Sequence, residues 1–207
     1  MSVTVTSGRP MPIELDLIPG ATPLDPDTIA GLRPAHIATQ ADLNAAEAAN
    51  ILAALNWARR ARTDTVLRRD YVQRLHKQMF GDVWRWAGTW RRLETTIGVD
   101  PLTIATRVEQ LLDDVRHWVA NASFEPHEIA VRLHHQMVLI HPFPNGNGRH
   151  TRLMADLLLK QLEREPFTWG GGALSSADDA RTRYIAALRS ADRGDLQPLL
   201  VFARSQL

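Results

Sequence analysis

The segment of this chain with the clearest chemical potential runs from His141 to Arg152, with the sequence His-Pro-Phe-Pro-Asn-Gly-Asn-Gly-Arg-His-Thr-Arg. It begins with an imidazole, which can exchange a proton near neutral pH. Gly146 and Gly148 allow the backbone to approach a ligand closely, and successive amides in such a turn form a concave anion site. Arg149 and Arg152 carry guanidinium groups, which match phosphate oxygens in a bidentate geometry. The segment therefore predicts a binding site for a phosphate-bearing ligand.

Two predicted helices would position this segment. The apolar run after Arg152 predicts a helix, so the anion site would lie at a helix N-terminus, where the backbone dipole favours negative charge. Arg149 and Arg152 would then point to one side of that helix. Before the segment, apolar residues recur at helical spacing and predict a helix from about Pro126 to Ile140.

The remaining patterns predict a mostly α fold. Helices are expected at 39–62, 65–80, 103–119 and 177–189, where apolar residues again follow the helical period. Residues 88–101 are rich in strand-forming residues between glycines and a proline, and they predict a short β-hairpin flap. Residues 1–36 are rich in proline and glycine and predict an extended N-terminal arm, and residues 37–207 would form a single domain.

The composition limits the class of protein. Hydrophobic residues make up 44% and charged residues 23% of the 207 residues, and the net charge is +1. These values give no reason to expect membrane or direct nucleic-acid binding. The absence of cysteine excludes disulfides and thiolate metal sites. Because neither a signal peptide nor an apolar span is apparent, we expect a cytoplasmic enzyme or binding domain.

The segment 141–152 resembles the active-site loop of the Fic family (filamentation induced by cAMP), His-Pro-Phe-x-(Asp/Glu)-Gly-Asn-Gly-Arg-x-x-Arg, with one departure at Asn145. The resemblance extends over roughly residues 30–205, and it is strongest to the subgroup called mobile mystery protein B. The resemblance to the subgroup includes the stretches Leu32–Ile37 and Leu43–Ile51, whereas Ala87–Arg91, Tyr184–Leu188, Ala191–Asp195 and Pro198–Leu199 resemble segments of the Fic family in general. It implies a Fic-type helical bundle in which residues 88–101 form the flap that docks the target.

The resemblance implies a protein adenylyltransferase, which moves AMP from ATP to a Ser, Thr or Tyr hydroxyl of a protein. His141 would be the general base. The phosphates would be held by the loop amides and the two arginines: Gly146, Asn147, Gly148, Arg149 and Arg152. Phe143 would anchor the loop in the core. The flap residues Thr95, Thr96, Ile97 and Gly98 would pair with an extended segment of the target.

The departure at Asn145 concerns the metal. The family carboxylate at this position binds Mg²⁺ (or Mn²⁺) together with ATP, and asparagine offers only a neutral oxygen. We therefore expect a weaker metal site, and a nucleotide- or partner-binding module without turnover stays an alternative. The expected partners are a nucleotide and a protein substrate, which could be the chain itself. An antitoxin or regulatory partner is also compatible with the resemblance.

A second family feature is an inhibitory helix of the form (Ser/Thr)-x-x-x-Glu-(Gly/Asn), whose glutamate pairs with the second arginine of the motif. The segment Ala38–Asn44 is a degraded match at the start of the helix predicted at 39–62. Asp42 and Glu47 are the candidate inhibitory residues, and either could instead position water in a hydrolase that removes AMP. The alternative for Thr39 and Asp42 is a capping box, Ser/Thr-x-x-Asp/Glu, which serves only the helix end.

Overall fold

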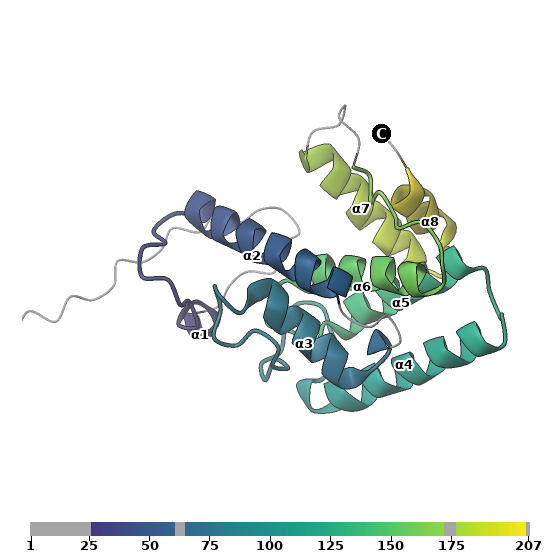
Figure 1. The fold of residues 1–207 in the computed structure, drawn as a ribbon, viewed down its shortest axis with the longest axis horizontal. Helices are drawn as coiled ribbons and strands as arrows, with labels where there is room; N and C mark the ends of the chain where they lie inside the picture. Colours follow the sequence, from purple (N-terminus) through teal and green to yellow (C-terminus); the bar gives the residue numbers. More distant parts are fainter. Residues whose placement is uncertain (1–25, 61–64, 172–176, 206–207) are drawn as a thin grey trace, which may run out of the picture.

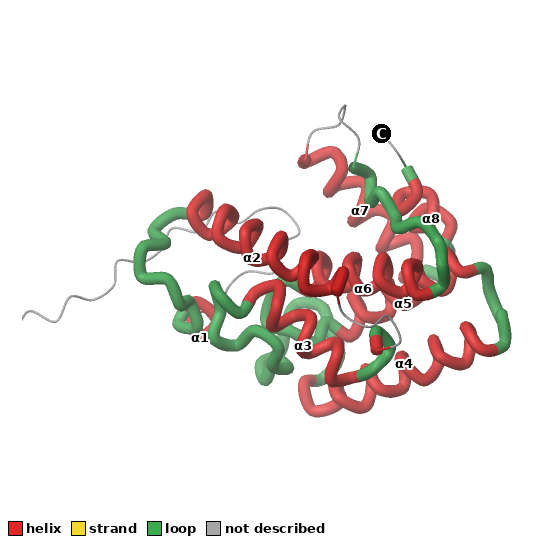
Figure 2. The backbone as a smooth tube through the Cα atoms, viewed as in Figure 1, coloured by secondary structure: helices red, strands yellow, loops and turns green. Residues whose placement is uncertain are grey.

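The computed structural model describes residues 26–60, 65–171 and 177–205. Within these ranges the chain is mostly helical, as predicted (Figures 1 and 2). The elements in chain order are α1 (Pro26–Ile29), α2 (Gln40–Arg60), α3 (Arg69–Phe80), the 3₁₀ helix η2 (Pro101–Thr103), α4 (Ile104–Ala120), α5 (Pro126–Ile140), α6 (Asn147–Gln161), α7 (Ala177–Asp192) and α8 (Gln197–Arg204). None of these helices is long and apolar enough to cross a membrane.

Helix α5 is the centre of the bundle. It packs against α6, α4 and α8, while α2 packs on α3 and α7 on α8 (Figure 1). Its side chains Ile129, Leu133, Met137 and Ile140 are all buried, as their helical spacing predicts. Because α5 ends at Ile140 and α6 begins at Asn147, the loop predicted to carry the chemistry connects the two central helices.

The helix predictions are largely confirmed, with differences at the chain ends. The bounds of α5 match the prediction, and α8, which begins with a proline in its first turn, was not predicted. Most of the predicted N-terminal arm, residues 1–25, lies outside the described residues, as do residues 61–62 of the helix predicted at 39–62. The rest of the arm contains the short helix α1 and a single β-bridge between Leu32 and Trp84.

The predicted β-hairpin at 88–101 is wrong, because this fully described segment contains no strand. Its backbone hydrogen bonds run to the end of α5 instead of across the flap: the amide of Arg91 donates to the carbonyl of Pro142 at 2.9 Å and that of Val99 to Ile140 at 3.3 Å. The buried Arg91 guanidinium also donates to the carbonyls of Leu93 and Val99. A side chain therefore satisfies carbonyls that strand pairing would otherwise satisfy.

A half-buried carboxylate on α6 fixes the chain that follows this helix. Asp156 accepts hydrogen bonds from the Phe167 amide at 3.1 Å and from the Trp169 indole at 3.0 Å. Burial raises the pKa of the Asp156 carboxyl to about 6. This contact holds residues 167–169 against α6, next to the α7–α8 pair.

Candidate active site

His141 ends helix α5 in a left-handed conformation. Its φ angle is +52°, its amide donates to the Met137 carbonyl at 3.1 Å, and Pro142 follows directly. A left-handed residue followed by proline is a common way to stop a helix. The sharp turn leaves the side chain of His141 at the junction between α5 and the glycine loop.

The environment of His141 keeps its imidazole neutral at physiological pH. The residue is only 5% exposed, and burial lowers the pKa of the ring to about 4. The nearby Arg91 charge acts in the same direction to a lesser extent. Nδ1 lies 3.4 Å from the Val138 carbonyl, which can only accept a hydrogen bond, so Nε2 is the nitrogen that carries the lone pair. The sequence predicted an imidazole that exchanges a proton near neutral pH, and burial accounts for the lower pKa.

Arg91 connects the flap to His141. Its Nε donates a hydrogen bond to the His141 carbonyl at 2.7 Å, and the residue as a whole is only 4% exposed. Sequence reasoning did not single out Arg91 as a site residue, although the stretch Ala87–Arg91 was part of the resemblance. An arginine is rarely buried unless several groups bond to it. The sequence signal for this role was an arginine at the start of the predicted flap.

One of the four predicted flap residues, Gly98, packs against His141. Its φ angle is +128°, and a Cβ atom added there would lie 2.9 Å from the His141 Cβ and 2.5 Å from Arg91 Nη2. Only glycine fits such a close approach. Thr95 donates from its hydroxyl to the Ile97 carbonyl at 2.6 Å, and Thr96 and Ile97 are exposed.

The loop between α5 and α6 is closed by Asn147. Its side chain accepts from the Phe143 amide at 2.9 Å and donates to the Phe143 carbonyl at 2.8 Å. Phe143 is fully buried, as predicted. Gly146 is left-handed with φ of +78°, and a Cβ there would overlap the Phe80 ring at 2.6 Å. The loop is therefore rigidly held, and the first amides of α6, from Asn147 and Gly148, have no acceptor inside the helix.

Asn145 uses its side-chain oxygen inside the loop, where it accepts a hydrogen bond from the Gly146 amide. This oxygen is neutral and already engaged, and the described residues contain no group of three His, Asp or Glu side chains placed to hold a metal ion. Asn145 therefore stays a prediction as a metal ligand, and it would offer Mg²⁺ a single neutral oxygen. Of the three amides expected to bind phosphate, that of Gly146 has this internal partner.

Arg149 is paired with an acidic residue of α2. Its Nη1 lies 2.6 Å from Glu47 Oε2, and its guanidinium lies 4.9 Å from the centroid of the Phe80 ring. Glu47 is only 4% exposed, and its other oxygen accepts from the Trp84 indole at 2.7 Å. The structure thus brings one of the two candidate inhibitory residues onto the first arginine of the motif.

The other candidate inhibitory residue, Asp42, serves the start of α2. Its carboxylate accepts from the Thr39 amide at 3.0 Å and the Thr39 hydroxyl at 2.8 Å, while the Asp42 amide donates back to that hydroxyl at 3.2 Å. This reciprocal pattern is the capping box that the sequence offered as the alternative.

Whereas Arg149 forms the ion pair with Glu47, Arg152 lies beside α7. Its Nε donates to the Gly148 carbonyl at 3.3 Å, and its guanidinium lies 5.4 Å from the centroid of the Tyr184 ring. The Tyr184 hydroxyl oxygen in turn lies 3.1 Å from His134 Nε2. Burial lowers the pKa of the Arg152 guanidinium. The two motif arginines therefore have different surroundings, although both belong to the same helix.

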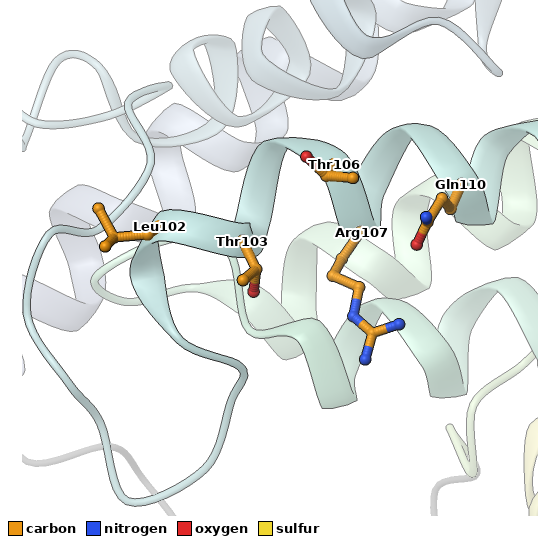
Figure 3. Close-up of a pocket in the computed structure, with 5 residues that line it drawn as sticks. All are labelled: Leu102, Thr103, Thr106, Arg107 and Gln110. Carbon is orange, nitrogen blue, oxygen red and sulfur yellow. The ribbon is translucent and has the colours of Figure 1, made fainter.

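The outer side of the η2–α4 segment carries a hollow of about 360 Å³, lined by Leu102, Thr103, Thr106, Arg107 and Gln110 (Figure 3). None of its lining residues belongs to the 141–152 loop or to the flap residues 95–98. This hollow is therefore separate from the anion-binding geometry.

The part of the chain that contains this loop is similar to known proteins. Residues 66–159, which span α3 to α6, match the model of the Fic/DOC family. The chain contains a Fic/DOC domain. It is 28% identical over 135 residues to the protein adenylyltransferase fic-1 of Caenorhabditis elegans, and 30% identical over 136 residues to that of Caenorhabditis briggsae. Each alignment covers 63% of this chain and 25% of the relative, so the chain spans about a quarter of the length of these relatives.

Solved structures show the same fold. Fic-1 of C. elegans (residues 134–508) superposes with a TM-score of 0.60 at 25% identity, covering 75% of this chain and 46% of that one. The BepC protein of Bartonella tribocorum, solved with bound AMPPNP, gives a TM-score of 0.64 at 17% identity, covering 81% of this chain and 87% of that one. The Fic-type helical bundle predicted from the sequence is thereby confirmed.

Proposed function

We propose that this domain transfers AMP from ATP to a hydroxyl group of a protein. The observation that carries the proposal is the position of a buried, neutral histidine directly before a glycine loop and a helix N-terminus that carries two arginines. The names of the fic-1 relatives support adenylyl transfer as the reaction. The domain would then bind ATP and a protein substrate.

In the proposed reaction, the substrate hydroxyl oxygen attacks the α-phosphorus and pyrophosphate leaves. His141 takes the hydroxyl proton on Nε2, and its neutral state at pH 7 makes it ready to do so. The amides of Asn147 and Gly148 face the phosphate oxygens at the start of α6, where developing negative charge is favoured. Arg149 and Arg152 complete the phosphate site, while the Gly146 amide holds the loop through Asn145.

The flap would position the protein substrate. Leu93 and Ile97 are each 51% exposed on it, and Gly98 packs against His141. An extended target segment that docks on these exposed flap residues would bring its hydroxyl to the histidine.

The test is the position of the transferred label. The purified chain is incubated with a candidate protein mixture and either α-³²P-ATP or γ-³²P-ATP. Adenylyl transfer labels protein from the α-labelled nucleotide only, whereas a kinase labels it from the γ-labelled one. His141→Ala is the control, and it should lower the rate of labelling by about 10²–10⁴-fold. Labelling that survives this substitution would contradict the proposed base.

A second proposal concerns regulation, and the Glu47–Arg149 ion pair supports it. While Glu47 holds Arg149, that guanidinium is not available to a phosphate, so the domain would be self-inhibited by α2. The departure from the family pattern is that Glu47 meets the first motif arginine and not the second. The same carboxylate could position a water molecule for removal of AMP, and an adenylylated protein incubated with the chain would release AMP in that case.

Four finer assignments complete the proposal. We assign the chain to the mobile mystery protein B subgroup, on the stretches Leu32–Ile37 and Leu43–Ile51. We propose a cytoplasmic location, and Mg²⁺ delivered mainly as the complex with ATP, since the loop itself offers one neutral oxygen. A regulatory or antitoxin partner would act through α2, the element that carries Glu47.

A further inference from the structure

A buried histidine outside the 141–152 segment connects the active-site loop to the flap. His76, on α3, has no exposed surface. Its Nε2 lies 3.0 Å from the carbonyl oxygen of Asn145, and its Nδ1 lies 3.0 Å from the amide nitrogen of Gly88. Its ring stacks on Phe143 with the centroids 3.7 Å apart. One side chain therefore contacts the loop, the residue that anchors the loop, and the beginning of the flap.

These contacts determine the tautomer of His76. An amide N–H can only donate, so Nδ1 must offer its lone pair to Gly88. A carbonyl can only accept, so Nε2 must carry the hydrogen that is donated to Asn145. A protonated ring would direct an N–H at the Gly88 N–H, and a ring protonated on Nδ1 alone would lose both bonds.

The two partners of His76 are themselves fixed. Gly88 has φ of +82°, and a Cβ there would lie 2.8 Å from both the Gln73 carbonyl oxygen and the Lys77 Cβ, so its peptide is packed closely on α3. The Asn145–Gly146 peptide is held from both sides: its N–H donates to the Asn145 side chain, and its C=O accepts from His76. The orientation of this peptide decides where the following amides point.

We propose that His76 is a positioning residue for phosphate binding: its neutral Nε2–H form orients the Asn145–Gly146 peptide and ties the active-site loop to the start of the flap. The inference rests on the proposed function in one respect, namely that the amides after this peptide bind the phosphates of ATP. His76 itself touches neither nucleotide nor substrate.

Two substitutions separate the two hydrogen bonds. A glutamine amide group reaches the place of Nε2 and can donate to Asn145, whereas the shorter asparagine reaches only the place of Nδ1 and can accept from Gly88. By calorimetry, His76→Gln should bind Mg-ATP within about twofold of the natural chain. His76→Asn leaves the buried Asn145 carbonyl without a donor, and it should bind Mg-ATP about tenfold more weakly. Affinity for adenosine should be equal in both variants, because adenosine has no phosphate.

The matched control is His150→Gln. His150 is buried in the same aromatic cluster, 5.5 Å from the His76 ring between centroids, and its Nε2 contacts the Val72 carbonyl at 3.0 Å. This variant loses a buried ring but keeps the contact to Asn145. It should therefore lower thermal stability as the His76 variants do, without the tenfold loss of Mg-ATP affinity. A loss of affinity equal to that of His76→Asn would overturn the proposal.

A measurement on the natural chain requires no substitution. Long-range ¹⁵N spectra of the His76 ring should show the Nε2–H tautomer between pH 6 and 8, and an Nδ1–H or charged ring would overturn the proposal. If the natural chain binds no ATP, the proposed function fails, but the positioning role is still decided by amide shifts. His76→Asn should displace the Gly146 amide signal more than that of Gly88, and His76→Gln should do the reverse. Equal displacement of both signals by both variants would refute the role.

Discussion

Glu47 and Arg149 are 102 positions apart in sequence, and their side chains meet at 2.6 Å. The glutamate is almost completely buried, while the Arg149 side chain is 36% exposed. Because the second Glu47 oxygen is held by the Trp84 indole, the carboxylate has a fixed orientation toward the arginine. Helix α2 thus places a negative charge at the point where the loop offers a positive charge to an anion.

Glu47→Gln should increase Mg-ATP affinity and the rate of labelling. Glutamine can still accept from Trp84 but has no charge to hold Arg149, so the guanidinium becomes available to a phosphate. A charge-assisted hydrogen bond is worth about 1.5–3 kcal/mol, which corresponds to a gain of roughly 10–100-fold in affinity. Calorimetry and α-³²P-ATP labelling measure the two effects.

Trp84→Phe is the matched control, because it removes the indole donor and leaves the charge of Glu47 in place. It should produce much less activation than Glu47→Gln. If neither substitution changes ATP affinity, the ion pair is structural and the proposed self-inhibition is wrong. If Glu47→Gln abolishes release of AMP from a modified protein, Glu47 belongs to a hydrolytic reaction.

The pH dependence of labelling should reflect the buried state of His141. Since burial lowers the pKa of the ring to about 4, the base stays unprotonated down to pH 5.5, and the initial rate should be flat between pH 8 and 5.5. For a histidine with an ordinary pKa near 6.5, the unprotonated fraction would be about tenfold smaller at pH 5.5 than at pH 8. Circular dichroism at each pH verifies that the domain stays folded. A tenfold decline of the rate in a folded sample would show that the ring titrates normally.

Asn145→Asp should make labelling more dependent on Mg²⁺. The substitution adds a carboxylate at a loop position whose side chain already bonds inside the turn, and Mg²⁺ prefers carboxylate oxygens. We expect higher labelling than the natural chain at high Mg²⁺, and weaker ATP binding when the metal is chelated, because the carboxylate then repels the phosphates. A Mg²⁺ titration of both chains measures this. Identical titration curves would remove position 145 from metal binding.

Arg91→Lys should loosen the flap while leaving the phosphate loop in place. Lysine keeps the positive charge but cannot reproduce the planar fork that reaches the carbonyls of Leu93 and His141. The KM for a protein substrate should rise about tenfold, and the affinity for Mg-ATP should change less than twofold. Hydrogen exchange of amides 92–99 should also be faster than in the natural chain. A selective loss of ATP affinity would contradict the assignment of Arg91 to the flap.

The free energy of unfolding should fall as the pH is lowered from about 6.5 to about 4. Burial lowers the pKa values of five histidines: that of His134 to about 3, those of His141 and His150 to about 4, that of His76 well below its ordinary value, and also that of His127. In this range the unfolded chain binds protons that the folded chain does not bind. Each neutral buried histidine therefore lowers the free energy of unfolding by about 1.4 kcal/mol per pH unit.

Asp156 acts in the opposite direction and provides the control. Its pKa is raised to about 6 from an ordinary value of 3.8, so the folded chain holds a proton there that the unfolded chain loses as the pH rises above about 4. Asp156→Asn should therefore make the loss of stability on acidification steeper between pH 6 and 4. Urea unfolding at several pH values measures both slopes. A stability that is constant from pH 7 to 5 would refute the assignment of neutral buried histidines.

The sequence predicted well what depends on local patterns. The spacing of apolar residues indicated α5 within its observed bounds, and Phe143 was correctly expected in the core. The capping box of Thr39 and Asp42 was also visible in the sequence, because it involves residues only three positions apart. Such interactions require no knowledge of the rest of the fold.

The features that the sequence did not reveal depend on contacts between distant segments. Residues 88–101 have strand-forming composition, but Arg91 and the end of α5 satisfy their backbone groups, and this could not be seen before α5 and the flap were brought together. The pKa of His141 follows from burial, which a motif does not report. His76 was missed for the same reason, since its two partners lie 69 and 12 positions away.

Because one arginine anchors the flap, the flap residues that face a protein target could change without a change in the rest of the domain. Carbonyls of the segment are gathered by the Arg91 guanidinium, so its shape does not depend on matching side chains across two strands. Residues 94–97 could therefore be exchanged, one or several at a time, without loss of the anchor. Selectivity for a protein target would then be a separable, interchangeable module, and variation or directed evolution could alter it while the histidine and the glycine loop stay the same.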